Sequence, residues 1–172
     1  MARVPLQSES SMPDQQALIA KIKAERGGKL LNLYRVLLNS PAVCEGWLNL
    51  FTAIRQKGKL PDRYRELAIM RVAVINGADY EYEAHVPFAI QAGMNQVQLN
   101  ELSRWRGSDK FDERERAVLG YTDTMTKNIQ VPDDVFAPIK KFFDPQEILE
   151  LTATIGGYNL VSRVLEALQV DH

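Results

Sequence analysis

Cysteine is nearly absent from this sequence of 172 residues, which contains Cys44 and no other. A single cysteine cannot form an intrachain disulfide or supply an iron–sulfur centre. Cys44 lies in a mostly apolar stretch with small neighbours, and a buried cysteine behaves as a small hydrophobic residue. We therefore predict that Cys44 is a core residue and that no disulfide stabilises the fold.

The sequence also lacks an excess of charge and a long apolar run. Its 21 Lys and Arg residues against 22 Asp and Glu residues leave a net charge of −1, which argues against nucleic acid and anionic membranes as partners. The longest apolar runs are broken by Arg71 and fall far short of the roughly 20 residues that span a bilayer. Residues 1–11 lack the apolar segment of a secretory signal. A soluble, cytoplasmic protein is the expectation.

Composition and length are those of an ordinary globular protein, with 45% hydrophobic and 25% charged residues. A chain of roughly 150 residues buries about 68–70% of its unfolded surface, so a stable core needs no covalent cross-link. No low-complexity tract or linker interrupts the sequence. We expect residues 1–12 to form a flexible N-terminal arm and residues 13–172 to form a single domain.

Apolar residues recur at spacings of three and four along almost the whole chain, and no stretch shows clean alternation with a period of two. This pattern predicts an all-α fold, with proline, aspartate and glycine marking helix ends. The expected helices begin near Pro13, Leu30, Pro41, Arg63, Asp79, Asn95, Asp112, Pro132 and Asp144. Ser40 and Asp79 are expected as N-caps, and Gly156–Gly157 is expected to interrupt the last helix.

Histidine is the side chain that titrates nearest neutrality, and this chain has only His85 and His172. Glu81 precedes His85 by four residues, so the two side chains share one face of a helix. From spacing alone, an exposed helix pair worth a few tenths of a kcal/mol is the plainer interpretation. A three-histidine zinc site is excluded within one chain, whereas a metal cluster of Glu66, Glu81 and His85 stays open.

Glu66 and Arg71 are charged residues inside the strongly apolar segment 65–73. Charged side chains are seldom buried without a partner. Glu66 is therefore expected either on the exposed flank of its helix or hydrogen-bonded in a pocket. Arg71 is expected to serve as an internal partner for an adjacent or facing helix.

Several segments of the chain together resemble the carboxymuconolactone decarboxylase family, which includes the AhpD-like alkylhydroperoxidases. The segments are Arg65–Ala73, Asn76–His85, Ala92–Gly93, Phe111–Ala117, Glu147–Leu151 and Ile155–Arg163. They extend over roughly residues 40–168, and the combination is far more specific than any one segment. The resemblance implies an all-α, AhpD-like helical domain that assembles into a homo-oligomer, as a trimer, dimer or hexamer.

One departure from the family pattern bears on the chemistry. In the peroxidase branch the pattern is a glutamate, two cysteines separated by two residues, and a histidine four residues further on. Glu66 and His85 match the outer positions, but Ala78 and Glu81 stand where the two cysteines belong. Peroxide reduction through a dithiol needs one thiolate to attack and a second thiol to resolve. We therefore predict that the chain is not a dithiol peroxidase.

The remaining branch of the family implies acid–base chemistry without a cofactor or metal, as in the decarboxylases that lack the cysteine pair. Decarboxylation of an unsaturated lactone acid or β-keto acid leaves an enolate, which needs a donor at its oxygen and an acid that returns a proton to carbon. We expect His85 to be that acid. Glu66 or Glu81 is expected to orient the imidazole and to raise its pKa.

A small carboxylate-bearing or lactone-like substrate also needs groups that bind it. Arg71 or Arg163 could hold the substrate carboxylate, and Tyr80 or Tyr82 could donate to the oxyanion. The alternatives for the same residues are simpler. The two tyrosines could be subunit-interface aromatics, and Arg163 could pair with a glutamate of its own helix.

Two other classes of function stay open. The first is a non-catalytic oligomeric protein related to the AhpD-like alkylhydroperoxidases that has lost dithiol activity, and a sealed pocket around His85 would favour it. The second is a metal-assisted enzyme that uses Glu66, Glu81 and His85.

Overall fold

The computed structural model describes residues 2–171. Met1, which belongs to the predicted N-terminal arm, and His172, which belongs to the predicted domain, lie outside the described residues. Within this range the secondary structure is helical and contains no strand, which confirms the all-α prediction. The helices are α1 (Gln16–Glu25), α2 (Asn32–Leu37), α3 (Pro41–Thr52), α4 (Asp62–Asn76), α5 (Asp79–Gln91), α6 (Gln96–Glu101), α7 (Glu113–Lys127), α8 (Asp133–Phe142) and α9 (Pro145–Leu168). Among these residues no helix is both long and apolar enough to cross a membrane.

Three short helical segments complete the described chain. The 3-10 turns η1 (Pro13–Gln15) and η3 (Leu102–Gly107) precede α1 and follow α6, and the π-helical turn η2 (Ala53–Lys57) continues α3. The chain divides into two compact units, residues 1–57 with 164–172, and residues 58–163. A single domain was expected over 13–172. No linker in the sequence marks the division.

The first unit contains α1 and α2, which both pack against α3. The segment expected as a flexible arm is hydrogen-bonded within this unit. The Arg3 amide donates to the Leu168 carbonyl over 2.8 Å, and the Gln7 amide donates to the Arg35 carbonyl over 3.1 Å. Cys44 of α3 is fully buried and free, which confirms the prediction of a core residue. Burial raises the pKa of its thiol to about 11, so Cys44 is protonated and a poor nucleophile at neutral pH.

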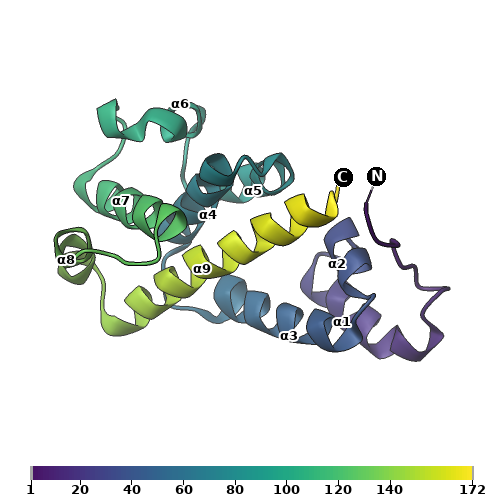
Figure 1. The fold of residues 1–172 in the computed structure, drawn as a ribbon. Helices are drawn as coiled ribbons and strands as arrows, with labels where there is room; N and C mark the ends of the chain where they lie inside the picture. Colours follow the sequence, from purple (N-terminus) through teal and green to yellow (C-terminus); the bar gives the residue numbers. More distant parts are fainter. Residues whose placement is uncertain (1, 172) are drawn as a thin grey trace. The chain divides into compact units, whose positions relative to one another are not determined.

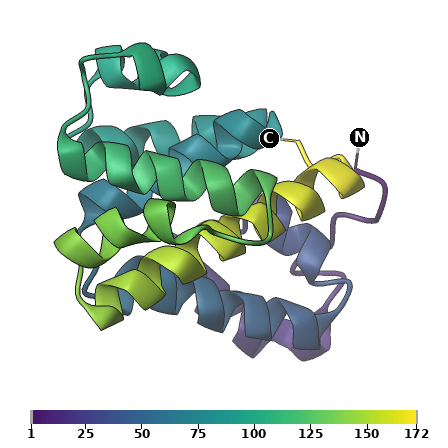
Figure 2. The same cartoon turned by 60° about the vertical axis from the view of Figure 1, so that its left-hand side comes forward.

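The second unit is built around α4, which packs against α5 on one side and α7 on another (Figure 1). Helix α8 in turn lies beside α7 (Figure 2). Because α4 has neighbours on several sides, residues on every face of it are buried. Its fully buried apolar residues are Leu67, Ala68, Ile69, Met70 and Val72. Any polar side chain from the middle of α4 therefore lies in the interior and needs an internal partner.

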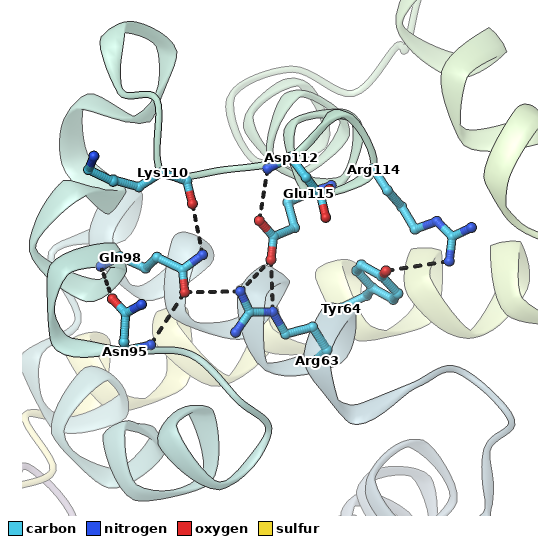
Figure 3. Close-up of polar contacts among 8 residues, drawn as sticks. All are labelled: Arg63, Tyr64, Asn95, Gln98, Lys110, Asp112, Arg114 and Glu115. Carbon is cyan, nitrogen blue, oxygen red and sulfur yellow. Dashed lines mark hydrogen bonds and ion pairs between the residues drawn. The ribbon is translucent and has the colours of Figure 1, made fainter.

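Arg63 joins the N-termini of two other helices in the second unit (Figure 3). Asn95 and Gln98 form a capping box at the start of α6, and Asp112 and Glu115 form one at the start of α7. The Arg63 guanidinium donates from Nε to Glu115 Oε1 over 2.8 Å and from Nη2 to Gln98 Oε1 over 3.0 Å. One side chain at the start of α4 thus bonds to both capping boxes.

Two local predictions are corrected by the structure, and the predicted N-cap position of Ser40 is confirmed. Ala78, and not Asp79, is the N-cap of α5, and Asp79 stands in the first turn instead. Ser40 does occupy the N-cap position of α3, but its side chain makes no capping hydrogen bond. Helix α9 continues through Gly156–Gly157 without the expected interruption. Ile155 and Tyr158, on either side of the glycines, are both buried, and this packing offsets the roughly 1 kcal/mol cost of each helical glycine.

Gly77 ends α4 in the left-handed conformation, with φ of +62°, and its amide donates to the Ala73 carbonyl. We expect Gly77→Ala to lower the free energy of unfolding by about 1–2 kcal/mol, because an L-residue is strained at positive φ. No atom lies within 4 Å of the added methyl group, so a steric clash does not contribute. Urea denaturation measures the change.

Gly46 provides the matched control for Gly77. It is exposed in the middle of α3, and an added methyl group also meets no atom within 4 Å. Gly46→Ala is expected to raise the free energy of unfolding by roughly 0.5–1 kcal/mol, because alanine is the better helix former. Equal effects of the two substitutions would contradict the conformational explanation.

Candidate functional site

His85 lies in α5 with its side chain in the interior of the second unit, and 4% of its surface is exposed. Glu81 lies one turn earlier on the same helix and is also buried. Its Oε1 is 3.0 Å from His85 Nε2. The pairing predicted from the spacing is therefore present, but the plainer interpretation of an exposed helix pair is wrong.

Glu66 of α4 lies on the other side of the imidazole ring. Its Oε2 is 2.7 Å from His85 Nδ1, and 1% of its surface is exposed. Arg65 Nε donates to the second carboxylate oxygen of Glu66 over 3.2 Å. Of the two expectations for Glu66, hydrogen bonding in the interior is the one confirmed. With a proton on Nδ1, the imidazole donates to Glu66, and Nε2 is the ring nitrogen that faces Glu81.

Tyr158 of α9 is the third residue on the imidazole, and the sequence analysis had not assigned it a role. Its hydroxyl lies 3.3 Å from His85 Nε2. The two rings meet edge to face, with centroids 5.1 Å apart and an interplanar angle of 89°. Tyr158 lies in the segment 155–163 that resembles the family, and a buried tyrosine hydroxyl usually has a hydrogen-bond partner. Those two facts indicate that the Tyr158 hydroxyl has a hydrogen-bond partner, but nothing in the sequence identifies His85 as that partner.

The charge on His85 depends on opposing effects. Burial lowers the pKa of the imidazole, whereas hydrogen bonds to Glu66 and Glu81 and the negative charges of both carboxylates raise it. The carboxylates prevail, and the pKa of His85 lies above its ordinary value of 6.5. This is the direction predicted from the sequence, and it favours the protonated form of the imidazole, which is the form that can act as an acid.

The raised pKa of His85 predicts a specific pH dependence of stability. A proton bound more tightly by the folded chain stabilises it fully below the unfolded pKa of about 6.5, and this contribution is lost as pH rises through the higher folded pKa. We expect the stability difference between wild type and His85→Gln to decrease as pH rises above about 6.5. Urea denaturation of both proteins across neutral and alkaline pH measures this. A difference that grows with pH would contradict the sign.

The same geometry argues against a metal cluster of Glu66, Glu81 and His85. Glu66 contacts Nδ1 and Glu81 contacts Nε2, so the two carboxylates lie at opposite ring nitrogens of His85. Three ligands of one ion must converge on a single point, and these do not. Within residues 2–171 no group of three or more histidine, cysteine, aspartate or glutamate side chains has an arrangement that could hold a metal ion.

Arg71, expected either as a substrate ligand or as an internal partner, is part of a separate buried network. Its Nε lies 2.6 Å from Asp123 Oδ1, and its Nη1 donates to the Leu102 carbonyl over 2.8 Å. Asp123 also accepts from the Trp105 indole over 3.3 Å. The arginine thus connects α4 with α7 and η3, which is the internal pairing that the sequence analysis anticipated.

The other expected substrate-binding residues are placed as follows. Arg163 of α9 donates from Nη1 to the main-chain and side-chain oxygens of Asn159, over 3.0 and 2.9 Å. The simpler alternative was a pair between Arg163 and a glutamate of the same helix, and the partner in the structure is Asn159 instead. Tyr80 and Tyr82 of α5 are half-buried, and burial raises the pKa of Tyr82. The tyrosine hydroxyl that lies 3.3 Å from His85 is that of Tyr158.

Comparison with known sequences agrees with the resemblance. The model of the carboxymuconolactone decarboxylase family matches residues 41–124. The uncharacterized protein YdfG of Bacillus subtilis is 24% identical over 106 residues, which cover 60% of this chain and 72% of YdfG. The uncharacterized protein YnjA of Escherichia coli is 26% identical over 126 residues, covering 73% of this chain and 66% of YnjA.

Solved structures show the same fold. A protein of unknown function from Agrobacterium tumefaciens, suggested to be the antioxidant defence protein AhpD, superimposes with a TM-score of 0.72 at 29% identity, over 78% of this chain and 92% of its own. A peroxidase-related protein from Silicibacter sp. TM1040 has a TM-score of 0.83 at 18% identity, with coverage of 99% and 91%. A cysteine-to-alanine variant of the debrominase Bmp8, in complex with 2,3,4-tribromopyrrole, has a TM-score of 0.80 at 17% identity, with coverage of 99% and 93%.

Proposed function

We propose that this chain, which belongs to the carboxymuconolactone decarboxylase family and has an AhpD-like fold, is a cofactor-free lyase or isomerase. Its substrate would be a small carboxylate- or lactone-bearing metabolite. The observation that carries this proposal is the buried imidazole of His85 between the carboxylates of Glu66 and Glu81. The single cysteine, Cys44, cannot support the dithiol cycle of a peroxidase.

Each residue of the site has a distinct part in the proposed reaction. Glu66 accepts from Nδ1 and orients the imidazole, as buried carboxylates do in other acid–base pairs. When the bond to the substrate carboxylate breaks, carbon dioxide leaves and its electron pair forms an enolate. Tyr158 donates a hydrogen bond to the enolate oxygen, and His85 Nε2 returns a proton to carbon. Glu81, also at Nε2, accepts a hydrogen bond from that nitrogen until the proton is transferred, and a proton from solvent restores Nε2 afterwards.

A group for the substrate carboxylate completes the proposal. Arg71 is bonded to Asp123 and Leu102, which leaves Arg163 as the proposed ligand. Among the described residues, the side-chain hydrogen bonds of Arg163 come from Nη1, so Nε and Nη2 retain donors for a carboxylate. Assembly into a homo-oligomer and a cytoplasmic location stay predictions.

One observation favours the non-catalytic alternative. His85 is 4% exposed, whereas the ring of Phe88, with its centroid 5.5 Å from that of His85, is 43% exposed. A substrate can reach the imidazole only if side chains around His85 move, because so little of the residue is exposed. If His85 stays buried, its three polar partners serve only to satisfy a buried imidazole.

Turnover of carboxymuconolactone tests the proposed function. Ultraviolet absorbance follows the loss of substrate, and released carbon dioxide identifies decarboxylation. The assay contains a metal chelator, and protein purified without an affinity tag is analysed for bound metals. We expect turnover that persists under chelation. Absence of turnover would overturn the specific decarboxylase assignment, and activity that disappears with the chelator would favour the metal-assisted alternative.

A further inference from the structure

The second unit contains a surface cavity that the proposed function does not use. Its volume is about 470 Å³, and it lies between η3, α7 and α8. The lining residues are Trp105, Arg106, Arg116, Ala117, Gly120, Val135 and Pro138. None of the residues assigned to the acid–base site is among them. The lining combines an aromatic ring, two guanidinium groups and an apolar wall.

Arg106 lines this cavity and is restrained by two contacts. Its guanidinium carbon lies 4.5 Å from the centroid of the Trp105 ring, and its Nη2 donates to Asp123 Oδ2 over 3.2 Å. Its side chain is nevertheless 68% exposed. Within residues 2–171 this is the single side-chain hydrogen bond that Arg106 makes, so Nε and Nη1 keep their donors. A guanidinium restrained by a contact with an aromatic ring and by a buried carboxylate loses less entropy when it binds an anion.

Arg116 adds a second positive charge beside the first. Its guanidinium carbon lies 5.4 Å from the same Trp105 ring centroid. Its Nη atoms donate to the carbonyls of Trp105, Ser108 and Arg106 over 3.3, 2.9 and 2.8 Å. These acceptors are neutral, and no carboxylate of the described residues forms an ion pair with Arg116. Its charge is therefore not neutralised by the protein.

The carboxylate nearest to Arg106 does not cancel this excess of positive charge. Asp123 is already paired with Arg71 over 2.6 Å, and Lys127 Nζ lies 3.8 Å from its Oδ2. Asp123 is thus shared by Arg71, Arg106 and Lys127. Arg116 forms no ion pair with it. The apolar remainder of the lining suits the hydrocarbon part of a ligand, because Ala117, Val135 and Pro138 offer no hydrogen-bonding side chain.

We propose that this cavity binds a small organic carboxylate with an apolar body. The carboxylate accepts hydrogen bonds from the open edge of Arg106 and is attracted by the charge of Arg116, while the body lies against the apolar wall. Bidentate pairing with a guanidinium is the geometry that a carboxylate favours. The proposal does not depend on the activity proposed for His85, because the two sites share no residue.

Benzoate is the probe for this site, and Trp105 is the reporter. The sequence contains two tryptophans, so Trp47→Phe leaves Trp105 as the only one. We expect benzoate to change Trp105 fluorescence in a saturable manner. Benzamide has the same ring and no charge. It is expected to bind at least about tenfold more weakly than benzoate, because it cannot accept a charge-assisted hydrogen bond from Arg106.

Two arginine variants distinguish specific binding in the cavity from general attraction of an anion to a basic surface. Arg106→Gln removes the proposed carboxylate ligand and is expected to weaken benzoate binding by about tenfold or more. Arg104→Gln is the matched control, because the Arg104 side chain is 75% exposed, pairs with Glu101 and does not line the cavity. It is expected to change the dissociation constant by less than about twofold.

Calorimetric titration of the otherwise unmodified protein with benzoate gives a second measurement that does not require Trp47→Phe. Saturable binding that Arg106→Gln weakens and Arg104→Gln preserves supports the proposal. Three results would overturn it: no saturable binding in either assay, equal binding of benzoate and benzamide, or equal losses in the two arginine variants.

Discussion

Replacing His85 by glutamine is expected to lower kcat by about 10²- to 10⁴-fold, which is the range that a positioned acid–base group contributes. Glutamine is close in size to histidine and can still donate to Glu66, but it cannot hold a transferable proton at Nε2. The effect should appear in kcat more than in KM, because the proton is transferred after the substrate has bound. Steady-state turnover of carboxymuconolactone measures both constants.

His172→Gln serves as the control, because it removes the only other histidine of the sequence. It is expected to leave kcat unchanged. For the wild type, kcat should fall as pH rises through the pKa of His85, since only the protonated imidazole acts as an acid, and the neighbouring carboxylates place that pKa above 6.5. Wild-type rates in a folded His85→Gln protein would refute the assignment of His85 as the acid.

Asp123→Ala is expected to have the largest effect on stability, lowering the free energy of unfolding by about 3–5 kcal/mol. The substitution leaves the guanidinium of Arg71 buried without a counter-charge, and Arg71 is only 6% exposed. It also removes the acceptor of the Trp105 indole N–H, which is buried as well. Urea denaturation monitored by circular dichroism measures the loss.

An exposed ion pair between α7, the helix of Asp123, and α8 provides the control for Asp123. Glu113 lies 2.6 Å from Lys141, the same separation as in the buried pair, but both side chains are mostly exposed. Glu113→Ala is therefore expected to change stability by less than about 1 kcal/mol. Combining Arg71→Met with Asp123→Leu should recover most of the loss, because apolar side chains of similar volume can replace a buried pair. Equal effects of Asp123→Ala and Glu113→Ala would contradict the burial argument.

Much of the fold was predictable because local signals mark most helix ends. Pro41 begins α3 and Gly77 ends α4 as expected, since proline fits the first helical turn and glycine accepts the left-handed conformation. Gly156–Gly157 was misjudged because glycine permits a break without requiring one. Whether a helix continues through glycine depends on packing of its neighbours, and the sequence pattern did not reveal that packing.

The site was only partly predictable for a similar reason. The Glu81–His85 pair follows from a spacing of four residues within one helix. Glu66 lies 19 residues before His85, and its role came from the family resemblance and not from spacing. Tyr158 lies 73 residues after His85, and no local pattern connects them. Burial of the whole group depends on α4 and α9 as well as α5, which is a property of tertiary packing.

The contacts of Arg63 have a consequence for local opening of the second unit. The amides of Gln98 and Glu115 donate to the capping residues at the starts of α6 and α7, and Arg63 is bonded to both of their side chains. If the start of α6 frays, Arg63 loses its hydrogen bond to Gln98, and if the start of α7 frays, it loses its hydrogen bonds to Glu115. Either loss leaves the guanidinium less restrained and so weakens its contact with the other helix. These two amides, on separate helices, should therefore exchange their hydrogens with solvent through one shared opening event.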